Sequence, residues 1–448
     1  MTAQQRALRK PIVLLAALAA LAFIGAFAAT QDDGIDSGSA AETGRWSMGS
    51  VLGASRPAGS TAIASAPPTV SVAAGPAARD PSRALEQKLA QIVGAIREDR
   101  PDVAMREVDA LIVEHPTFRL AHLIRGDLLR ARVQPLRRFG DVSKTAPQEA
   151  VDALRSEALV RLNALREPPR NGLAPRYILK LYPAQRHALV IDSRRSRLYV
   201  FENVAGHARL VTDYYVTLGK RGVEKTREGD QKTPLGVYHV TANLPRSKLA
   251  DFYGVGAFPI NYPNAWDRRL GRKGFGIWLH GTPSDTYSRP PRASDGCIVL
   301  ANPDLESVGR QVQTGLTPVI IADEIEWTSE AELARERQAL EAALEAWRSD
   351  WQSGNTDRYL THYSGRFRAG EQDYRDWAAH KRRVNAGKQW IRVGVANTAM
   401  FRYPRERDFV VVVFDQDYRS SNLSNRMRKL QYWVLEKGQW KILYEGAA

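Results

Sequence analysis

The sequence predicts a multidomain protein in which a small α-helical module precedes a mostly β domain, and an α+β domain follows. Three observations lead to this division. The chain has 448 residues, more than one hydrophobic core normally supports. Residues 82–167 repeat apolar side chains at helical spacing, whereas residues 178–325 alternate short β-branched and aromatic runs with turn residues. A long amphipathic helix and a series of strands then fill residues 330–446.

The amino-terminal 81 residues are expected to direct export and to tether the rest of the chain. Residues 1–29 place Arg6, Arg9 and Lys10 before an apolar run that ends in Ala-Phe-Ala, the layout of a secretory signal peptide. The run also approaches the 20 or so residues that an uncleaved membrane anchor needs. Residues 30–81 are rich in Ala, Pro, Ser and Gly without apolar periodicity, which predicts a disordered tether. We therefore expect the body of the protein in the periplasm or cell envelope, with membrane contact only through this segment.

Residues 82–167 are expected to form a helical module. The stretch from Ala104 to Leu129 resembles one tetratricopeptide-like helix pair, interrupted at His115-Pro116. A single pair cannot build the concave groove of a repeat array, so we expect a packing or docking role. The first predicted helix places four apolar side chains on one face: Leu85, Leu89, Ile92 and Ile96.

Charge and cysteine content limit the function classes. The net charge is +15, yet the arginines are scattered and follow no nucleic-acid-binding motif, so no nucleic acid is expected as a partner. A carboxylate-rich wall polymer suits such a charge equally well. Cys297 is the only cysteine, which excludes an intramolecular disulfide and leaves a thiol available for chemistry.

Cys297 ends a Ser-Asp-Gly-Cys turn, and His280 lies seventeen residues before it. A cysteine attacks as the thiolate, which a neighbouring imidazole helps to form. The runs FGIWLH and CIVL are typical of buried strands, so base and nucleophile are expected at neighbouring strand ends. Gly296 permits a tight turn, and we expect the Gly296 and Cys297 amides to point inward as oxyanion donors.

These motifs together resemble the YkuD-type L,D-transpeptidases, which remodel bacterial peptidoglycan. His280-Gly281-Thr282, the Pro-rich loop and the S-x-G-C turn carry the resemblance, with support from GDQKTPLGVY and from the hairpin sequence ALVIDSRRSRLYVFE. It covers about residues 178–325 and implies a β-sandwich with a short helix. The family most often has His where this chain has Asp295. If that position only orients the turn, the change has no cost; if it tunes the thiolate, an acidic residue there would raise the cysteine pKa.

The resemblance also implies how the site works. Cys297 would attack a stem-peptide amide, His280 would move the proton, and the Gly281 carbonyl would orient the imidazole. The family's Arg two residues after the cysteine is Val299 here, so we expect Arg292 to meet the substrate carboxylate. No cofactor or metal is expected, because the other histidines are scattered. The remaining residues expected to bind substrate or line the site are Trp278, Thr282, Ser294, Asp295, Tyr253 and Phe258.

The carboxy-terminal part, residues 330–446, resembles the NTF2-like cone fold. Its first helix carries one stripe of Leu340, Leu344, Trp347 and Trp351, and the last two strands meet at Lys437-Gly438. The resemblance implies a pocket, and we expect binding or dimerisation, including a wall or envelope protein partner, rather than a second active site. The residues expected to line this pocket are Tyr363, Trp377 and His380.

Three functions remain open at this stage. The first is an exported transpeptidase in which an amine acceptor resolves a thioester on Cys297. The second uses the same Cys-His site as a carboxypeptidase or hydrolase, with water as the acceptor. The third is a non-enzymatic wall-binding scaffold, for which Cys297→Ala would be silent. A metallopeptidase is the weakest alternative, because His280 has no H-E-x-x-H partner.

Overall fold

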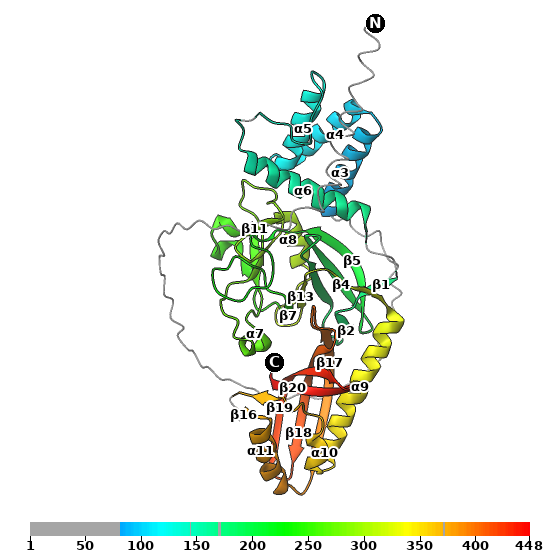
Figure 1. The fold of residues 1–448 in the computed structure, drawn as a ribbon, viewed down its shortest axis with the longest axis vertical. Coiled ribbons are helices and arrows are strands. Elements are labelled where there is room, and N and C mark those ends of the chain that lie inside the picture. Colours follow the sequence, from blue (N-terminus) through cyan, green and yellow to red (C-terminus); the bar gives the residue numbers. More distant parts are fainter. Residues whose placement is uncertain (1–80, 144, 169–171, 371) are drawn as a thin grey trace, which may run out of the picture.

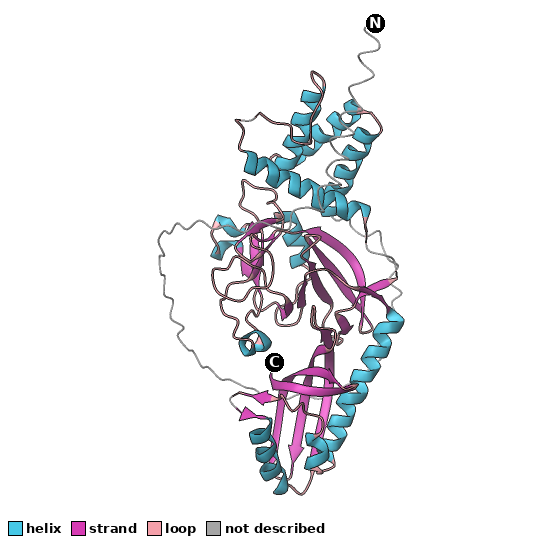
Figure 2. Cartoon of the chain, in the orientation of Figure 1, coloured by secondary structure: helices cyan, strands magenta, loops and turns pink. Residues whose placement is uncertain are grey.

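The computed structural model describes residues 81–143, 145–168, 172–370 and 372–448. The predicted leader and all but the last residue of the predicted tether lie outside this range. Three units follow one another along the long axis: helices at one end, a β-rich unit in the middle, and a sheet flanked by helices at the other end (Figures 1 and 2). Within the described residues, no helix combines the length and apolarity needed to cross a membrane.

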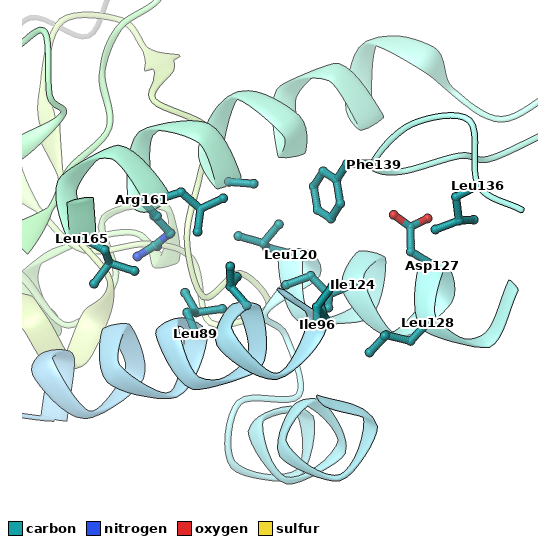
Figure 3. A pocket seen from close by; sticks show the side chains of 13 residues that line it. Leu89, Ile96, Leu120, Ile124, Asp127, Leu128, Leu136, Phe139, Arg161 and Leu165 are labelled. Carbon is teal, nitrogen blue, oxygen red and sulfur yellow. The ribbon is translucent and has the colours of Figure 1, made fainter. Parts of the chain in front are cut away.

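The helical module consists of α3 (Pro81–Arg97), α4 (Pro101–Glu114), α5 (Arg119–Ala131) and α6 (Gln148–Arg166). Its apolar stripes pack into one core, and α6 lies between the other helices and the β-rich unit (Figure 1). Figure 3 shows an apolar pocket between α3, α5 and α6, with Asp127 and Arg161 as its charged residues. Its free volume of about 40 Å³ holds only a few water molecules, so the pocket is part of the core.

The central unit is built on a five-stranded sheet with the order β5-β4-β3-β13-β7. Strand β13 runs parallel to β3 and antiparallel to β7. Residues 188–191 of β3 and all of β13 are apolar and buried, as expected for strands that are covered on both faces. The strands are β3 (His187–Asp192), β4 (Arg197–Val204), β5 (His207–Tyr215), β7 (Gly236–His239) and β13 (Pro318–Ala322).

A second sheet with the order β12-β10-β9-β8 carries the cysteine and histidine segments. Their side chains pack with those of the first sheet in one core, which gives the predicted sandwich. Nearby, β11 (Arg292–Ser294) runs parallel to β6 (Leu218–Gly219). The strands of the second sheet are β8 (Leu244–Pro245), β9 (Gly256–Pro259), β10 (Trp278–His280) and β12 (Ile298–Val299), and the helices of this unit are α7 (Ala265–Arg269), α8 (Asn302–Gly309) and the 3₁₀ turns Arg246–Lys248 and Asp251–Tyr253.

The carboxy-terminal unit wraps helices around a long antiparallel sheet. The stripe of α9 (Glu330–Gln352) is buried against that sheet, as predicted. The turn between the last two strands uses positive φ at Lys437 and Gly438, which two-residue hairpins require. The other elements are α10 (Thr356–Leu360), β15 (Arg368–Ala369), β16 (Gln372–Asp373), α11 (Tyr374–Ala386), β17 (Ile391–Arg402), β18 (Phe409–Ser420), β19 (Leu423–Glu436) and β20 (Gln439–Ala447).

The segment between the helical module and the first strand of the central sheet contains two short strands. β1 (Leu173–Pro175) pairs with β14 (Trp327–Ser329), and β2 (Ile178–Lys180) is the edge strand of the carboxy-terminal sheet, beside β17. Residues 178–180 therefore belong to the last unit rather than to the catalytic one. The short apolar run of β2 lies among prolines and a glycine, a composition that is typical of a loop. Its pairing is not visible in the local sequence, because the partner strand β17 lies more than two hundred residues away.

Candidate active site

Strands β10 and β12 bring the histidine and the cysteine together. They pair in parallel, with Leu279 beside Ile298 and His280 beside Val299. Cys297 immediately precedes β12, so it lies beside Trp278. Because side chains alternate along a strand, Cys297 and His280 project from the same face, displaced by two residues.

The imidazole of His280 is held in one tautomer. Its Nδ1 lies 2.7 Å from the Gly281 carbonyl oxygen, and because a carbonyl only accepts, Nδ1 carries the hydrogen. The Nε2 lone pair is then available as a base. Burial lowers the pKa of His280 to about 4, and the charge of Arg289 also lowers it against the opposing effect of the Gly281 hydrogen bond. The ring is therefore neutral near pH 7.

The thiol of Cys297 is half-buried and protonated at rest. Burial raises its pKa, and the carboxylate of Asp295 raises it further. The Trp278 amide and the charges of Lys225 and Arg289 act in the opposite direction. The sulfur lies 3.4 Å from the Gly276 carbonyl, which accepts the S–H. The resting site is thus a neutral thiol with a neutral imidazole.

The turn before the cysteine differs from the expected one in its hydrogen bonding. Gly296 has φ +124°, and a Cβ there would lie 2.7 Å from the Lys232 carbonyl oxygen, so only glycine fits. Its amide does not point inward, because it donates to Ser294 Oγ at 3.1 Å. The same hydroxyl donates to the Cys297 carbonyl at 2.6 Å. Of the two expected oxyanion donors, only the Cys297 amide has no acceptor among the described residues.

Two further residues fix this turn. Thr233, in the Thr-Pro-x-Gly segment, donates to the Gly296 carbonyl at 3.0 Å and accepts from the Gly219 amide at 2.9 Å. Asp295 is exposed and accepts hydrogen bonds from Lys220 at 3.1 Å and from Gln231 at 3.0 Å. Ser294 and Thr233 therefore hold the turn rather than facing a substrate.

Asn302 fixes the strand end that carries His280, a role that the sequence did not indicate. Its Oδ1 accepts from the amides of Val255 and Thr282, both at 3.2 Å, and its Nδ2 donates to the Thr282 carbonyl at 2.9 Å. A Cβ on Gly281 would lie 2.1 Å from Asn302 Oδ1. Asn302 is the first residue of α8, but Ala301 is the cap residue, and the Asn302 side chain bonds to the histidine loop instead of capping the helix.

The cations whose charges act on the thiol do not include Arg292, which was expected to meet the substrate carboxylate. The Arg292 guanidinium donates to the Ser193 carbonyl at 3.3 Å, and the charges that act on Cys297 are those of Lys225 and Arg289. Lys225 is buried in an ion pair with Asp230 at 2.8 Å. Arg289 lies in the loop after the histidine, with its guanidinium carbon 4.6 Å above the Phe252 ring.

Aromatic rings surround the imidazole. Tyr253 lies 5.1 Å from the His280 ring and 5.0 Å from the Trp278 ring, measured between centroids, and Phe252 lies 5.9 Å from His280. Tyr253 therefore lies beside both His280 and Trp278, whereas Phe258 is buried in the sandwich core. Thr282 is also buried, and its hydroxyl donates to the Tyr287 carbonyl at 3.3 Å, so it supports the loop.

The residues expected to line a pocket in the last unit instead form part of a buried polar and aromatic cluster. Tyr363 accepts from the Trp347 indole at 3.2 Å and donates to Glu445 at 3.1 Å, while Trp377 is buried beside it. His380 stacks over Trp377 at 6.4 Å. Glu445 also pairs with the buried Lys429 at 3.3 Å. In the described part of the chain, no group of three or more His, Cys, Asp or Glu side chains could hold a metal ion.

Comparison with known proteins decides the domain identities. Residues 186–321 match the profile of the YkuD L,D-transpeptidase catalytic domain, and residues 339–446 match that of the Cds6 carboxy-terminal NTF2-like domain. The central unit is an L,D-transpeptidase catalytic domain. Such a domain places the protein among peptidoglycan enzymes of this family. A comparison with curated proteins gave no match.

Two solved structures are similar to this chain over more than half of its length. Bd1075 of Bdellovibrio bacteriovorus is 28% identical, with a TM-score of 0.54, over 62% of this chain and 98% of that one. The helical cell shape determining protein Pgp2 of Campylobacter jejuni is 26% identical, with a TM-score of 0.53, over 61% of this chain and 95% of that one. The mostly β domain and the NTF2-like domain were thus both predicted correctly from sequence.

Proposed function

We propose that the protein is an exported L,D-transpeptidase that links peptidoglycan stem peptides through a thioester on Cys297. The observation that carries the proposal is the pairing of β10 with β12, which places a neutral imidazole and the only thiol on one face. The domain match supplies the substrate class. The excess of positive charge suits a carboxylate-bearing polymer.

In the first half-reaction, the sulfur of Cys297 bonds to the carbonyl carbon of the amide before the terminal D-Ala. The thiol proton passes to His280 Nε2, whose tautomer is set by the Gly281 carbonyl. The developing oxyanion meets the Cys297 amide, which is free among the described residues. The C–N bond then breaks, the D-Ala amine takes the proton from His280, and a thioester remains.

In the second half-reaction, an amine of another stem attacks the thioester carbon. His280 accepts the amine proton and returns it to the departing sulfur, so the enzyme is regenerated. Because water can attack by the same route, a carboxypeptidase would use identical residues. The raised pKa of Cys297 fits either outcome, because the proton is removed only as the substrate arrives.

Products separate the two outcomes. The purified protein is incubated with tetrapeptide-bearing muropeptides, and the products are identified by mass spectrometry. Cross-linked dimers are expected, and Cys297→Ala should form none. If only trimmed monomers form at several acceptor concentrations, the enzyme is a hydrolase rather than a transferase. Unchanged muropeptides would refute both activities.

Export is part of the proposal and rests on the layout of residues 1–29. We propose a periplasmic or envelope location in which the helical module, the catalytic domain and the NTF2-like domain lie outside the cytoplasm. A fusion of alkaline phosphatase to residue 81 should be active, since this reporter works only after export. Deletion of residues 1–29 should abolish that activity.

A further inference from the structure

The loop between the two catalytic strands is fixed to the helical module. The ring of Tyr287 lies 4.6 Å from the His115 ring and 5.1 Å from the Phe118 ring, measured between centroids. The adjacent Ser288 hydroxyl donates to Glu157 Oε1 at 2.7 Å. Two consecutive loop residues therefore contact the helical module. Tyr287 contacts the turn between α4 and α5, and Ser288 contacts α6.

Buried charges join the module to the catalytic domain beneath this contact. Arg161 of α6 pairs with Glu157 at 2.9 Å and with Glu86 of α3 at 2.6 Å. Glu86 also pairs with Arg197 of β4 at 3.0 Å. All four side chains are buried. Of these pairs, the one between Glu86 and Arg197 joins the module to the catalytic domain, where Arg197 also pairs with Asp213.

The same network reaches the backbone of the loop. The Arg161 guanidinium lies 3.9 Å above the ring of Tyr215, the last residue of β5. The Tyr215 hydroxyl donates to the Arg289 carbonyl at 2.9 Å, and the hydroxyl of Thr217 donates to the same oxygen at 2.9 Å. The Arg289 carbonyl is thus held by two hydrogen bonds from the end of β5, directly after the two residues that contact the module.

The guanidinium of Arg289 forms no ion pair with the described residues. Its guanidinium stacks on Phe252, whose ring adjoins His280, and among the described residues no atom accepts a hydrogen bond from it. Its charge acts on both His280 and Cys297. A guanidinium fixed on an aromatic face with its planar set of donors free is well suited to bind a carboxylate.

We propose that the helical module positions Arg289, through Tyr287 and Ser288, to bind the carboxylate of the terminal D-Ala that leaves the stem peptide. The inference rests on the proposed function for its substrate. That carboxylate belongs to the residue whose nitrogen forms the scissile amide. The Arg289 guanidinium, stacked on the ring beside His280, can therefore bind it while the carbonyl of the scissile amide faces Cys297. Tyr287 and Ser288 act through Arg289 and are positioning residues.

Two substrates test the carboxylate contact. The full chain and its variants are assayed with a stem tetrapeptide and with the same peptide ending in a neutral amide. Arg289→Gln should raise KM for the acid by roughly 10- to 100-fold, the range of a charge-assisted hydrogen bond, and change kcat/KM for the amide little. Equal loss for both peptides would overturn the role of Arg289.

The role of the module is tested by Tyr287→Ala and Ser288→Ala, which should raise KM for the acid in the same direction by a smaller factor. Thr286→Ala is the matched control, because among the described residues its hydroxyl bonds only to the neighbouring Asp285. If the KM for the acid in both positioning variants equals that of this control, while their circular dichroism is unchanged, the module has no part in positioning Arg289.

A readout without peptidoglycan separates this inference from the proposed function. Cys297 is alkylated with iodoacetate, which is anionic, and with iodoacetamide, which is neutral. The ratio of the two rates should fall severalfold in Arg289→Gln and in Tyr287→Ala, because the cation that attracts the anion is lost or displaced. If the ratio falls but the unaltered protein does not process muropeptides, the proposed function fails and the placement of Arg289 stands. An unchanged ratio in an enzyme active on muropeptides overturns the inference alone.

Discussion

Replacement of Asn302 by Ala tests whether the histidine loop is held in place by one side chain. The change removes two hydrogen bonds accepted by Oδ1 and one donated by Nδ2. At about 1 kcal/mol each, their loss weakens the local structure by about 3 kcal/mol. Thr282, whose amide and carbonyl are both involved, is buried, so water replaces these bonds poorly.

An energy of about 3 kcal/mol corresponds to roughly a hundredfold change in a local opening equilibrium. Hydrogen exchange resolved at single amides should therefore show the protection of Val255 and Thr282 falling by about that factor in Asn302→Ala. Acylation of Cys297 should slow as well, because the Gly281 carbonyl that orients His280 belongs to the released loop.

The control is Asn203→Ala, which also removes three hydrogen bonds, to Tyr182, Gln185 and Gly206, at the β4–β5 turn of the same domain. It should cost similar stability and leave the acylation rate unchanged. Normal acylation in Asn302→Ala, with lost protection, would show that the loop does not need this clamp for catalysis. Retained protection would refute the hydrogen-bond reasoning itself.

Three further predictions concern the thiol, its turn and the last domain. Burial raises the pKa of Cys297, and His280 stays neutral above its pKa of about 4, so the thiolate fraction grows with pH. The rate of alkylation by iodoacetamide should therefore rise about tenfold per pH unit from pH 6 to 8. A rate that does not change over this range would indicate a preformed thiolate–imidazolium ion pair. Gly296→Ala places a Cβ against a backbone carbonyl and should abolish acylation, whereas Gly315→Ala, also at positive φ but in open space, should cost only about 1 kcal/mol of stability in urea denaturation and retain acylation. Glu445→Gln leaves the buried Lys429 without its anion and should destabilise the NTF2-like domain by about 3 to 5 kcal/mol. The expected result is unfolding of this domain at a lower temperature. An unchanged transition temperature would show that water solvates the cluster.

The sequence predicted the parts of the site that depend on local pattern. Apolar runs ending in His280 and beginning after Cys297 indicated strand ends, and the strands pair as neighbours. The stripe of α9 and the final hairpin followed from periodicity and turn chemistry in the same way. These features need only information from adjacent residues, which the side-chain period of a strand or helix supplies.

What the sequence missed depends on contacts between distant segments. Ser294 takes the Gly296 amide that was expected to face the oxyanion, a competition between neighbours that spacing does not reveal. Asn302 has the features of a helix cap, yet its side chain finds partners across the fold. Arg289 could not be preferred to Arg292, because only the fold shows that the Arg292 guanidinium donates to the Ser193 carbonyl while that of Arg289 lies over the Phe252 ring.

The central claim is that Cys297, assisted by His280, carries the acyl group. Intact-mass measurement after treatment with a carbapenem tests it most directly, because this class of β-lactam acylates an activated nucleophile without the need for an acceptor. The account predicts one added acyl mass per chain, absent in Cys297→Ala and strongly slowed in His280→Ala. An adduct that persists in Cys297→Ala, or that forms at the normal rate in His280→Ala, would contradict it.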